Sequence, residues 1–205
     1  SAASDVYKRQ SMSGATMNAM DLLRESLANA PVIWKGDYPY FIHPVTDGVP
    51  RLKPEVIQAI IKLSVPLVDW NEIDVILGIE AMGLPLSAPL SIETGIPMVV
   101  ARKRNYDLPG EIEINQQTGY SKGSIFINDL IPGEKVVIID DVISTGGTMK
   151  AVIEGVRKTG AIIQNTIIIV EKGSGMEELK GENPDIKFNS LVKLEMNGEK
   201  IVILE

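Results

Sequence analysis

The pattern of apolar and polar positions along the chain predicts strands that alternate with helices. Short apolar runs typical of buried parallel strands occupy residues 75–78, 97–101, 135–139 and 165–170, with a further strand at 124–127. Helical periodicity occupies residues 54–64, 83–94 and 149–159. This order predicts an α/β fold, a mostly parallel twisted sheet flanked by helices. Its ligand should lie at the carboxyl ends of the strands.

The two ends of the chain show patterns that differ from the strand–helix alternation of the middle part. Residues 1–16 show no periodicity and lack the apolar core of a signal peptide, which predicts a disordered leader before a single domain at 17–205. A helix should begin at Asn18, with Asp21 completing its cap. Near the other end, Asn197 and Gly198 lie between two strand-like segments, 191–196 and 199–204, and predict a C-terminal β-hairpin.

Composition narrows the class of protein. The chain has 205 residues, 44% of them hydrophobic and 23% charged, as in ordinary soluble globular proteins. It has no cysteine, which excludes disulfides and is compatible with a reducing cytoplasm. The single histidine, His43, cannot build a zinc site alone and is expected in a loop or at the surface. A net charge of −7 without a basic run argues against nucleic acid as a partner, and no apolar stretch approaches the roughly 20 residues of a membrane span.

The most informative segment is 136–148, with the sequence VVIIDDVISTGGT. An apolar strand is followed by Asp140 and Asp141 (the acid pair) where that strand should end, and then by a small hydroxyl-rich turn before a helix. A strand, a glycine turn and a helix N-terminus together form a phosphate cradle. The turn has no P-loop lysine and no G-x-G-x-x-G spacing. The acid pair suits a phosphorylated sugar instead, because its carboxylates accept hydrogen bonds from vicinal ribose hydroxyls. The plainer alternative is a turn whose acids only cap the helix.

Three further segments should meet this edge of the sheet. Residues 78–83 form a strand-to-helix turn with glycine at both ends, which suits a second anion. Arg102, Lys103 and Arg104 follow the next strand, where cations would neutralise phosphates. Residues 105–123 form a long, mostly polar segment, which is typical of a lid that excludes water from a reacting sugar. Each has a plainer reading: an ordinary turn, a solvated charge cluster, and a surface excursion or small hairpin.

The segment 136–148 resembles the 5-phosphoribosyl 1-pyrophosphate (PRPP) signature of type I phosphoribosyltransferases. Over residues 37–172 the chain is most similar to the archaeal hypoxanthine/guanine enzymes, which are related to adenine phosphoribosyltransferase. The motifs are 40–50 (YFIHPVTDGVP), 80–84 (EAMGL), 102–104 (RKR), 108–111 (LPGE) and 118–123 (TGYSKG).

The resemblance implies a pentosyltransferase of purine salvage, Mg²⁺-dependent, cytoplasmic and homodimeric. It would make IMP or GMP and pyrophosphate from PRPP and a purine base. It assigns residues 31–50 to a hood, with 38–47 over the purine, and residues 105–123 to the lid. Catalytic roles go to Asp140, Asp141, Tyr120 and Lys122. PRPP-binding roles go to Ser144, Thr145, Gly146, Gly147, Thr148, Ala81, Met82, Gly83, Arg102 and Lys103. Base-binding roles go to Lys172 and Phe41. Mg²⁺ arrives with PRPP, and the acid pair supplies its candidate protein ligands.

Several positions depart from related enzymes and keep alternatives open. Adenine enzymes carry arginine where this chain has Met82 and glutamate where it has Gly119, and human-type hypoxanthine enzymes carry aspartate where it has Ser144. The proton acceptor is therefore unassigned, with Glu111 and Glu113 as candidates. An adenine- or xanthine-using transferase is one alternative. The other is a non-catalytic PRPP-sensing regulator, which should carry a basic DNA-binding module.

Overall fold

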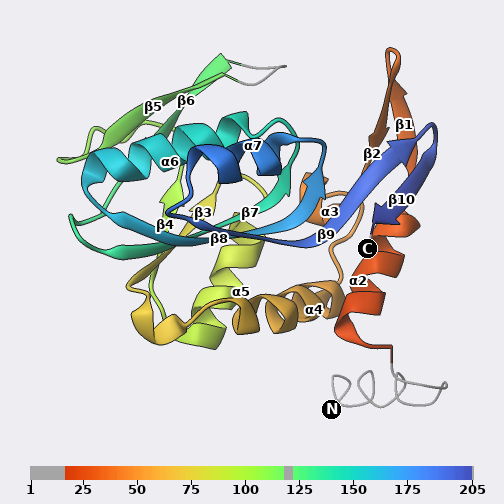
Figure 1. The fold of residues 1–205 in the computed structure, drawn as a ribbon, viewed down its shortest axis with the longest axis horizontal. Coiled ribbons are helices and arrows are strands. Elements are labelled where there is room, and N and C mark those ends of the chain that lie inside the picture. Colours follow the sequence, from red (N-terminus) through yellow and green to blue (C-terminus); the bar gives the residue numbers. More distant parts are fainter. Residues whose placement is uncertain (1–16, 118–121, 205) are drawn as a thin grey trace.

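The computed structural model describes residues 17–117 and 122–204, so the predicted leader and the tip of the predicted lid lie outside the described residues. Its main sheet has the strand order β10-β9-β8-β7-β3-β4, and every neighbouring pair is parallel except β9 and β10 (Figure 1). This confirms the predicted mostly parallel sheet. The strands are β3 (Val75–Ile79), β4 (Met98–Ala101), β7 (Lys135–Ile143), β8 (Ile162–Lys172), β9 (Lys187–Asn197) and β10 (Lys200–Leu204).

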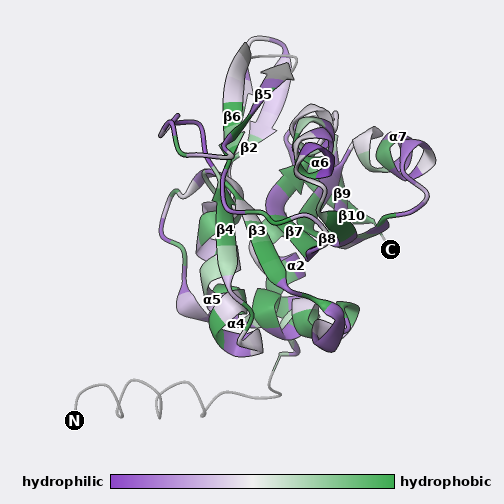
Figure 2. Cartoon of the chain, turned by 90° about the vertical axis from the view of Figure 1, so that its left-hand side faces the viewer, coloured by the Kyte–Doolittle hydropathy of each residue, from purple (hydrophilic) through white to green (hydrophobic). Residues whose placement is uncertain are grey.

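Helices cover both faces of this sheet (Figure 1). One face carries α4 (Pro54–Ser64) and α5 (Leu84–Thr94), with α2 (Ala19–Ala28) packed against α4; the other carries α6 (Gly147–Thr159) and α7 (Gly175–Glu182). Because alternate strand residues face opposite sides, β7 contributes to two cores. Val136 and Ile138 pack in the core with α6, while Val137 and Ile139 pack in the core with α4 and α5. The central strands are accordingly green in the hydropathy colouring of Figure 2.

The predicted hood region contains a small antiparallel hairpin and a short helix. These are β1 (Val32–Lys35), β2 (Tyr38–Phe41) and α3 (Pro44–Asp47). The hairpin lies beside the end of the main sheet where β9 and β10 are found (Figure 1). There the Trp34 indole Nε1 donates to Glu199 Oε1 at 2.8 Å. Between α4 and β3 the chain makes two short 3-10 turns, η2 (Val65–Leu67) and η3 (Trp70–Glu72).

The segment predicted as an irregular lid is partly ordered into a β-hairpin. Strands β5 (Ile112–Gln117) and β6 (Lys122–Ile127) pair antiparallel and lie over α6 (Figure 1). Ile114 and Ile127 are buried against that helix, and Gly155 of α6 faces them. The alternative of a small hairpin thus describes the backbone correctly. The physical reason is that 112–114 alternates apolar and polar residues and 125–127 is a short apolar run, and both patterns are typical of strands.

Several predicted boundaries shift, and two details are confirmed. Strand β7 runs through the acid pair to Ile143 rather than ending before it. The C-terminal hairpin forms as predicted, but its turn residues are Gly198 and Glu199, because Asn197 pairs with Lys200. Asn18 caps α2 by accepting the Asp21 N–H at 2.8 Å, as expected. No helix in the described part of the chain is long and apolar enough to cross a bilayer.

Candidate functional site

The turn at residues 144–148 (the phosphate turn) connects the end of β7 to the N-terminus of α6. Gly146 has a left-handed backbone (φ +79°), which favours glycine, and α6 begins at the next residue without an acidic side chain in its first turn. The turn encloses a cavity of about 190 Å³ that Asp140 also lines. The dipole of α6 points its positive end at this cavity. The predicted residues Ser144, Thr145, Gly146, Gly147 and Thr148 therefore line one concave surface whose geometry suits an anion.

The acid pair lies where β7 loses one of its neighbours. Strand β3 pairs with β7 only as far as Gly78 opposite Ile139, whereas β8 still pairs with Asp140 through Ile168. In the sheet, β4 lies on the outer side of β3, and β8 lies on the outer side of β7. The chain therefore proceeds in opposite directions from the β3–β7 pair, and the space between the ends of these two strands is the topological switch point of the sheet. Ligands of open α/β sheets bind at such a point.

Burial strongly affects the charge of the acid pair. Asp140 is 7% exposed and Asp141 is 8% exposed. Burial raises the pKa of Asp140 to about 6, although a hydrogen bond from Asp141 and the charge of Lys103 act in the opposite direction. Burial, followed by the neighbouring Asp140 charge, raises the pKa of Asp141 well above its ordinary value. The environment of both carboxyl groups therefore disfavours their charged forms in the absence of ligand.

The turn at residues 78–83 (the pyrophosphate turn) closes tightly at Gly83. A Cβ there would lie 2.6 Å from the Ile79 carbonyl oxygen and 2.8 Å from that of Ile139, so only glycine fits. The Glu80–Ala81 peptide bond is cis. Ala81 is exposed, and the sulfur of half-buried Met82 lies 3.3 Å from the position a Cβ on Gly48 would take. The hood therefore contacts the pyrophosphate turn through Met82.

Glu80 connects this turn to the basic segment, a role that sequence reasoning missed. Its Oε2 accepts the backbone N–H of Lys103 at 3.0 Å and lies 3.0 Å from Arg102 Nε. The Arg102 backbone also exchanges two hydrogen bonds with Phe126 of β6. Arg102 and Lys103 are thereby held beside the pyrophosphate turn, as predicted. The position of Glu80 inside the turn was the available signal.

The two predicted base-binding residues lie close to each other. Lys172 is the last residue of β8, and its Nζ lies 5.6 Å from the centre of the Phe41 ring. The same ammonium group donates to the hydroxyl of Tyr38 and lies 4.5 Å from the centre of its ring. Phe41 is only 5% exposed, so it supports this group from within the core. Tyr38 is the residue of the group that the sequence did not single out.

A hydrogen-bond network centred on Asp47 gives the hood its internal order. Asp47 accepts from the Tyr40 hydroxyl at 2.6 Å, the Thr46 hydroxyl at 2.7 Å and the His43 N–H at 3.0 Å. Burial and the Asp47 carboxylate raise the pKa of Tyr40, and the charge of Asp141 adds to this effect. The network therefore lies within electrostatic reach of the acid pair.

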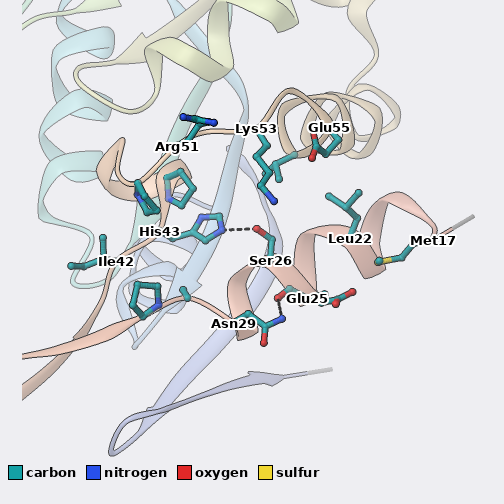
Figure 3. Close-up of a pocket in the computed structure, with 15 residues that line it drawn as sticks. Met17, Leu22, Glu25, Ser26, Asn29, Ile42, His43, Arg51, Lys53 and Glu55 are labelled. Atoms are coloured by element: carbon teal, nitrogen blue, oxygen red, sulfur yellow. Dashed lines mark hydrogen bonds between the residues drawn. The ribbon is translucent and has the colours of Figure 1, made fainter. Parts of the chain in front are cut away.

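His43 lies in the loop between β2 and α3, as one of the two expectations had it, but it is buried rather than at the surface. It is 2% exposed and caps α3, with Nδ1 accepting the Val45 N–H at 3.2 Å. In the neutral ring, Nε2 then carries the proton and donates to Ser26 Oγ at 2.9 Å (Figure 3). Burial lowers the pKa of His43 to about 4. Both ring nitrogens are satisfied locally, which allows a single polar ring to be buried here.

His43 also lines the cavity drawn in Figure 3. This cavity has a volume of about 430 Å³ and lies between α2, residues 42–44 and residues 50–56. It shares no lining residue with the cavity at the phosphate turn. We therefore place the candidate site at the smaller cavity, where the predicted residues converge.

The lid residues are described only in part. Tyr120 and the side chain of Lys122 lie outside the described residues. Both candidate proton acceptors are engaged within the hairpin region. Glu111 accepts from the Tyr106 N–H at 3.1 Å and from Asn128 Nδ2 at 2.8 Å, and Glu113 accepts from Ser124 Oγ at 2.6 Å.

The side chains that the structure describes do not by themselves form a complete metal site. Within residues 17–117 and 122–204, no group of three or more His, Cys, Asp or Glu side chains is placed to hold a metal ion. The acid pair offers two adjacent carboxyl groups. This donor set fits Mg²⁺ that is carried largely by a substrate's phosphate oxygens, since Mg²⁺ commonly uses one or two carboxylates together with phosphates.

Comparison with known proteins agrees with this geometry. Residues 51–197 match the phosphoribosyl transferase domain family. The chain is 47% identical over 186 residues to a hypoxanthine/guanine phosphoribosyltransferase of Ferroglobus placidus, covering 91% of this chain and 98% of the relative. It is 47% identical over 180 residues to the enzyme of the same name from Methanocella paludicola, covering 88% and 94%.

Solved structures resemble the whole fold. Adenine phosphoribosyltransferase from Thermoanaerobacter pseudethanolicus is 26% identical with a TM-score of 0.68, over 83% of this chain and 99% of that one. The adenine enzyme of Trypanosoma brucei, in complex with AMP, pyrophosphate and ribose-5-phosphate, has a TM-score of 0.71 over 88% of this chain and 82% of that one; at 23% identity it supports the fold alone. From the match over residues 51–197 and from these relatives, the chain belongs to the phosphoribosyl transferase family.

Proposed function

We propose that this enzyme transfers the 5-phosphoribosyl group of PRPP to hypoxanthine or guanine, giving IMP or GMP and pyrophosphate. One observation carries the proposal. The phosphate turn, the acid pair and the pyrophosphate turn converge at the switch point of the sheet, in a chain that is 47% identical to hypoxanthine/guanine phosphoribosyltransferases. Adenine enzymes share the fold at 26% identity or less among those compared, which makes adenine the second candidate base.

In the proposed reaction the site residues mainly hold the substrates in position and stabilise the charge that develops on them. The phosphate turn binds the 5′-phosphate, and the acid pair accepts hydrogen bonds from the ribose hydroxyls. As the bond from the anomeric carbon to pyrophosphate breaks, positive charge develops on the ring, and the Asp140 and Asp141 carboxylates offset it. A purine nitrogen then bonds to that carbon and loses its proton. Arg102 and Lys103 hold the departing pyrophosphate.

Mg²⁺ is the proposed cofactor, held by the acid pair together with PRPP, and when bound it makes the leaving group less basic.

Lys172 has donors only and suits a 6-oxo group, with Phe41 behind it. Tyr120 and Lys122 are proposed to close over the ligand as part of the lid. We expect a cytoplasmic homodimer, and light scattering after size-exclusion chromatography tests the oligomer.

Steady-state assays with PRPP and Mg²⁺ test the function directly. Hypoxanthine, guanine, adenine, xanthine and orotate are compared side by side, with pyrophosphate release as the common measurement. We expect the highest kcat/KM for hypoxanthine or guanine. A preference for adenine would make adenine the substrate instead. PRPP binding without turnover of any base would favour a non-catalytic, PRPP-sensing regulator.

A further inference from the structure

Behind the phosphate turn lies a short segment, residues 173–175, that we call the brace. It joins Lys172, the end of β8, to α7. The Gly175 N–H donates to the Ser144 carbonyl oxygen at 2.9 Å. Gly173 has φ +76°, and a Cβ there would lie 3.3 Å from that same oxygen. The brace therefore contacts the first residue of the phosphate turn from two positions.

The contact at Gly175 is too close for any side chain. A Cβ on Gly175 would lie 2.5 Å from three backbone atoms of the turn: Ser144 O, Thr145 C and Gly146 N. Backbone atoms cannot rotate aside as a flexible side chain can, so either the turn or the brace would have to move. Gly175 is not among the glycines with positive φ, so steric space rather than backbone conformation requires glycine here.

The turn also approaches the brace closely from its own side. A Cβ on Gly146 would lie 3.2 Å from the Gly175 carbonyl oxygen and 3.2 Å from Leu179 Cδ1 of α7. Leu179 is buried. None of residues 173–175 lines the cavity, which the turn's own residues enclose together with Asp140, Val142, Ile143, Met149 and Ile168. The brace can therefore affect a ligand only by holding the turn in place.

We propose that residues 173–175 are a positioning element for the 5′-phosphate of PRPP. The brace fixes the backbone of the phosphate turn and ties it to the Lys172 end of β8. This proposal rests on the proposed function, because it assigns the 5′-phosphate to the phosphate turn. It adds that Gly175, which touches no substrate, sets how tightly that phosphate is held.

The test compares Gly175→Ala with Gly181→Ala, a variant of the same helix whose Cβ meets no heavy atom within 4 Å. Calorimetry measures the binding of ribose 5-phosphate and, separately, of pyrophosphate with Mg²⁺. We expect Gly175→Ala to weaken ribose 5-phosphate binding by roughly 10- to 100-fold, because a shift near 1 Å misplaces the turn. Pyrophosphate binding should change less than about twofold, since the pyrophosphate turn lies elsewhere. Gly181→Ala should behave as wild type with both ligands.

A second pair of variants decides the matter if Gly175→Ala does not fold. Gly173→Ala brings a milder clash at a positive φ, and Gly198→Ala places the same strain (φ +58°) in open space. Selective weakening of ribose 5-phosphate binding in Gly173→Ala but not in Gly198→Ala supports the brace. The proposal is overturned if the two variants bind ribose 5-phosphate equally well, or if Gly173→Ala loses ribose 5-phosphate and pyrophosphate binding in parallel. If the wild type transfers phosphoribosyl groups while the brace variants bind normally, only the brace fails; a wild type that does not bind ribose 5-phosphate removes both proposals.

Discussion

The Glu80 carboxylate accepts the backbone N–H of Lys103 at 3.0 Å, which ties the pyrophosphate turn to the basic end of β4. The same oxygen lies 3.0 Å from Arg102 Nε. An anion entering this site must therefore compete with a carboxylate of the protein for the Arg102 charge. We therefore expect Glu80 both to order the site and to weaken its attraction for pyrophosphate.

Glu80→Gln should separate these two effects. The amide oxygen can still accept from Lys103, but the competing charge is gone, so we expect pyrophosphate to bind a few-fold more tightly, as about 0.5–1 kcal/mol of partly exposed ion pairing implies. Glu80→Ala, which loses both, should bind pyrophosphate more weakly than wild type. Product-inhibition constants measure this, and Glu72→Gln, at the Lys135 ion pair, is the control. Equal weakening of pyrophosphate binding in the Gln and Ala variants would contradict competition between Glu80 and pyrophosphate for Arg102.

Changing both Asp140 and Asp141 to Asn should abolish most turnover while preserving the fold. The amides remove the negative charge that offsets the ribosyl cation, and we expect kcat/KM for PRPP to fall by roughly 100-fold or more. Circular dichroism checks the fold. Activity close to wild type would remove the acid pair from the mechanism.

The same double variant should be more stable than wild type at pH 7.5. Burial raises the folded-state pKa of both acids, that of Asp140 to about 6, so the stability that each contributes is complete below its unfolded-state pKa of about 4 and is lost as the pH rises through its raised folded-state pKa. Asparagine does not titrate and escapes this loss. The expected gain in unfolding free energy is on the order of 2 kcal/mol at pH 7.5 and close to zero at pH 4. Thermal unfolding at both pH values measures it, and a gain that does not depend on pH would argue against the charge explanation.

Lys172→Met should erode any preference for 6-oxopurines, mainly by lowering kcat/KM for hypoxanthine and guanine. A buried donor discriminates strongly only when the wrong base leaves it unpaired. Tyr38→Phe removes the hydroxyl that holds Lys172 and should show a smaller loss in the same direction. If Lys172→Met leaves the base preference unchanged, specificity belongs to backbone groups of the hood at 38–47.

Gly155→Ala should loosen the β5–β6 hairpin from α6. A Cβ at Gly155 would lie 1.9 Å from Ile114 Cδ1, so the Ile114 side chain must leave its place against α6 or the hairpin must shift. We expect faster hydrogen exchange at residues 112–117 and 122–127 and a higher KM for PRPP. In the wild type, PRPP with Mg²⁺ should slow exchange in these residues. Exchange that ligand leaves unchanged would mean that the hairpin does not close.

Much of the fold and of the site's outline follows from local pattern. The phosphate turn is contiguous in sequence, so its strand, glycines and helix could be recognised together. The contacts that hold it could not, because Gly175 and Gly146 are far apart in the chain and nothing local marks their approach. The burial of His43 could not be predicted for a similar reason: its ring pairs with Ser26 of α2, and no periodicity in the sequence reveals that contact.

The hydrogen bond between Trp34 and Glu199 gives the protein an intrinsic optical reporter. The chain has two tryptophans, and the other, Trp70, donates to the Val65 carbonyl oxygen in the connection between α4 and β3. Trp34 is 51% exposed, so its emission should respond to any displacement of the β1–β2 hairpin from the C-terminal strands. Trp70→Phe would leave a single-tryptophan enzyme in which hood movement can be followed by stopped-flow fluorescence, without an attached dye.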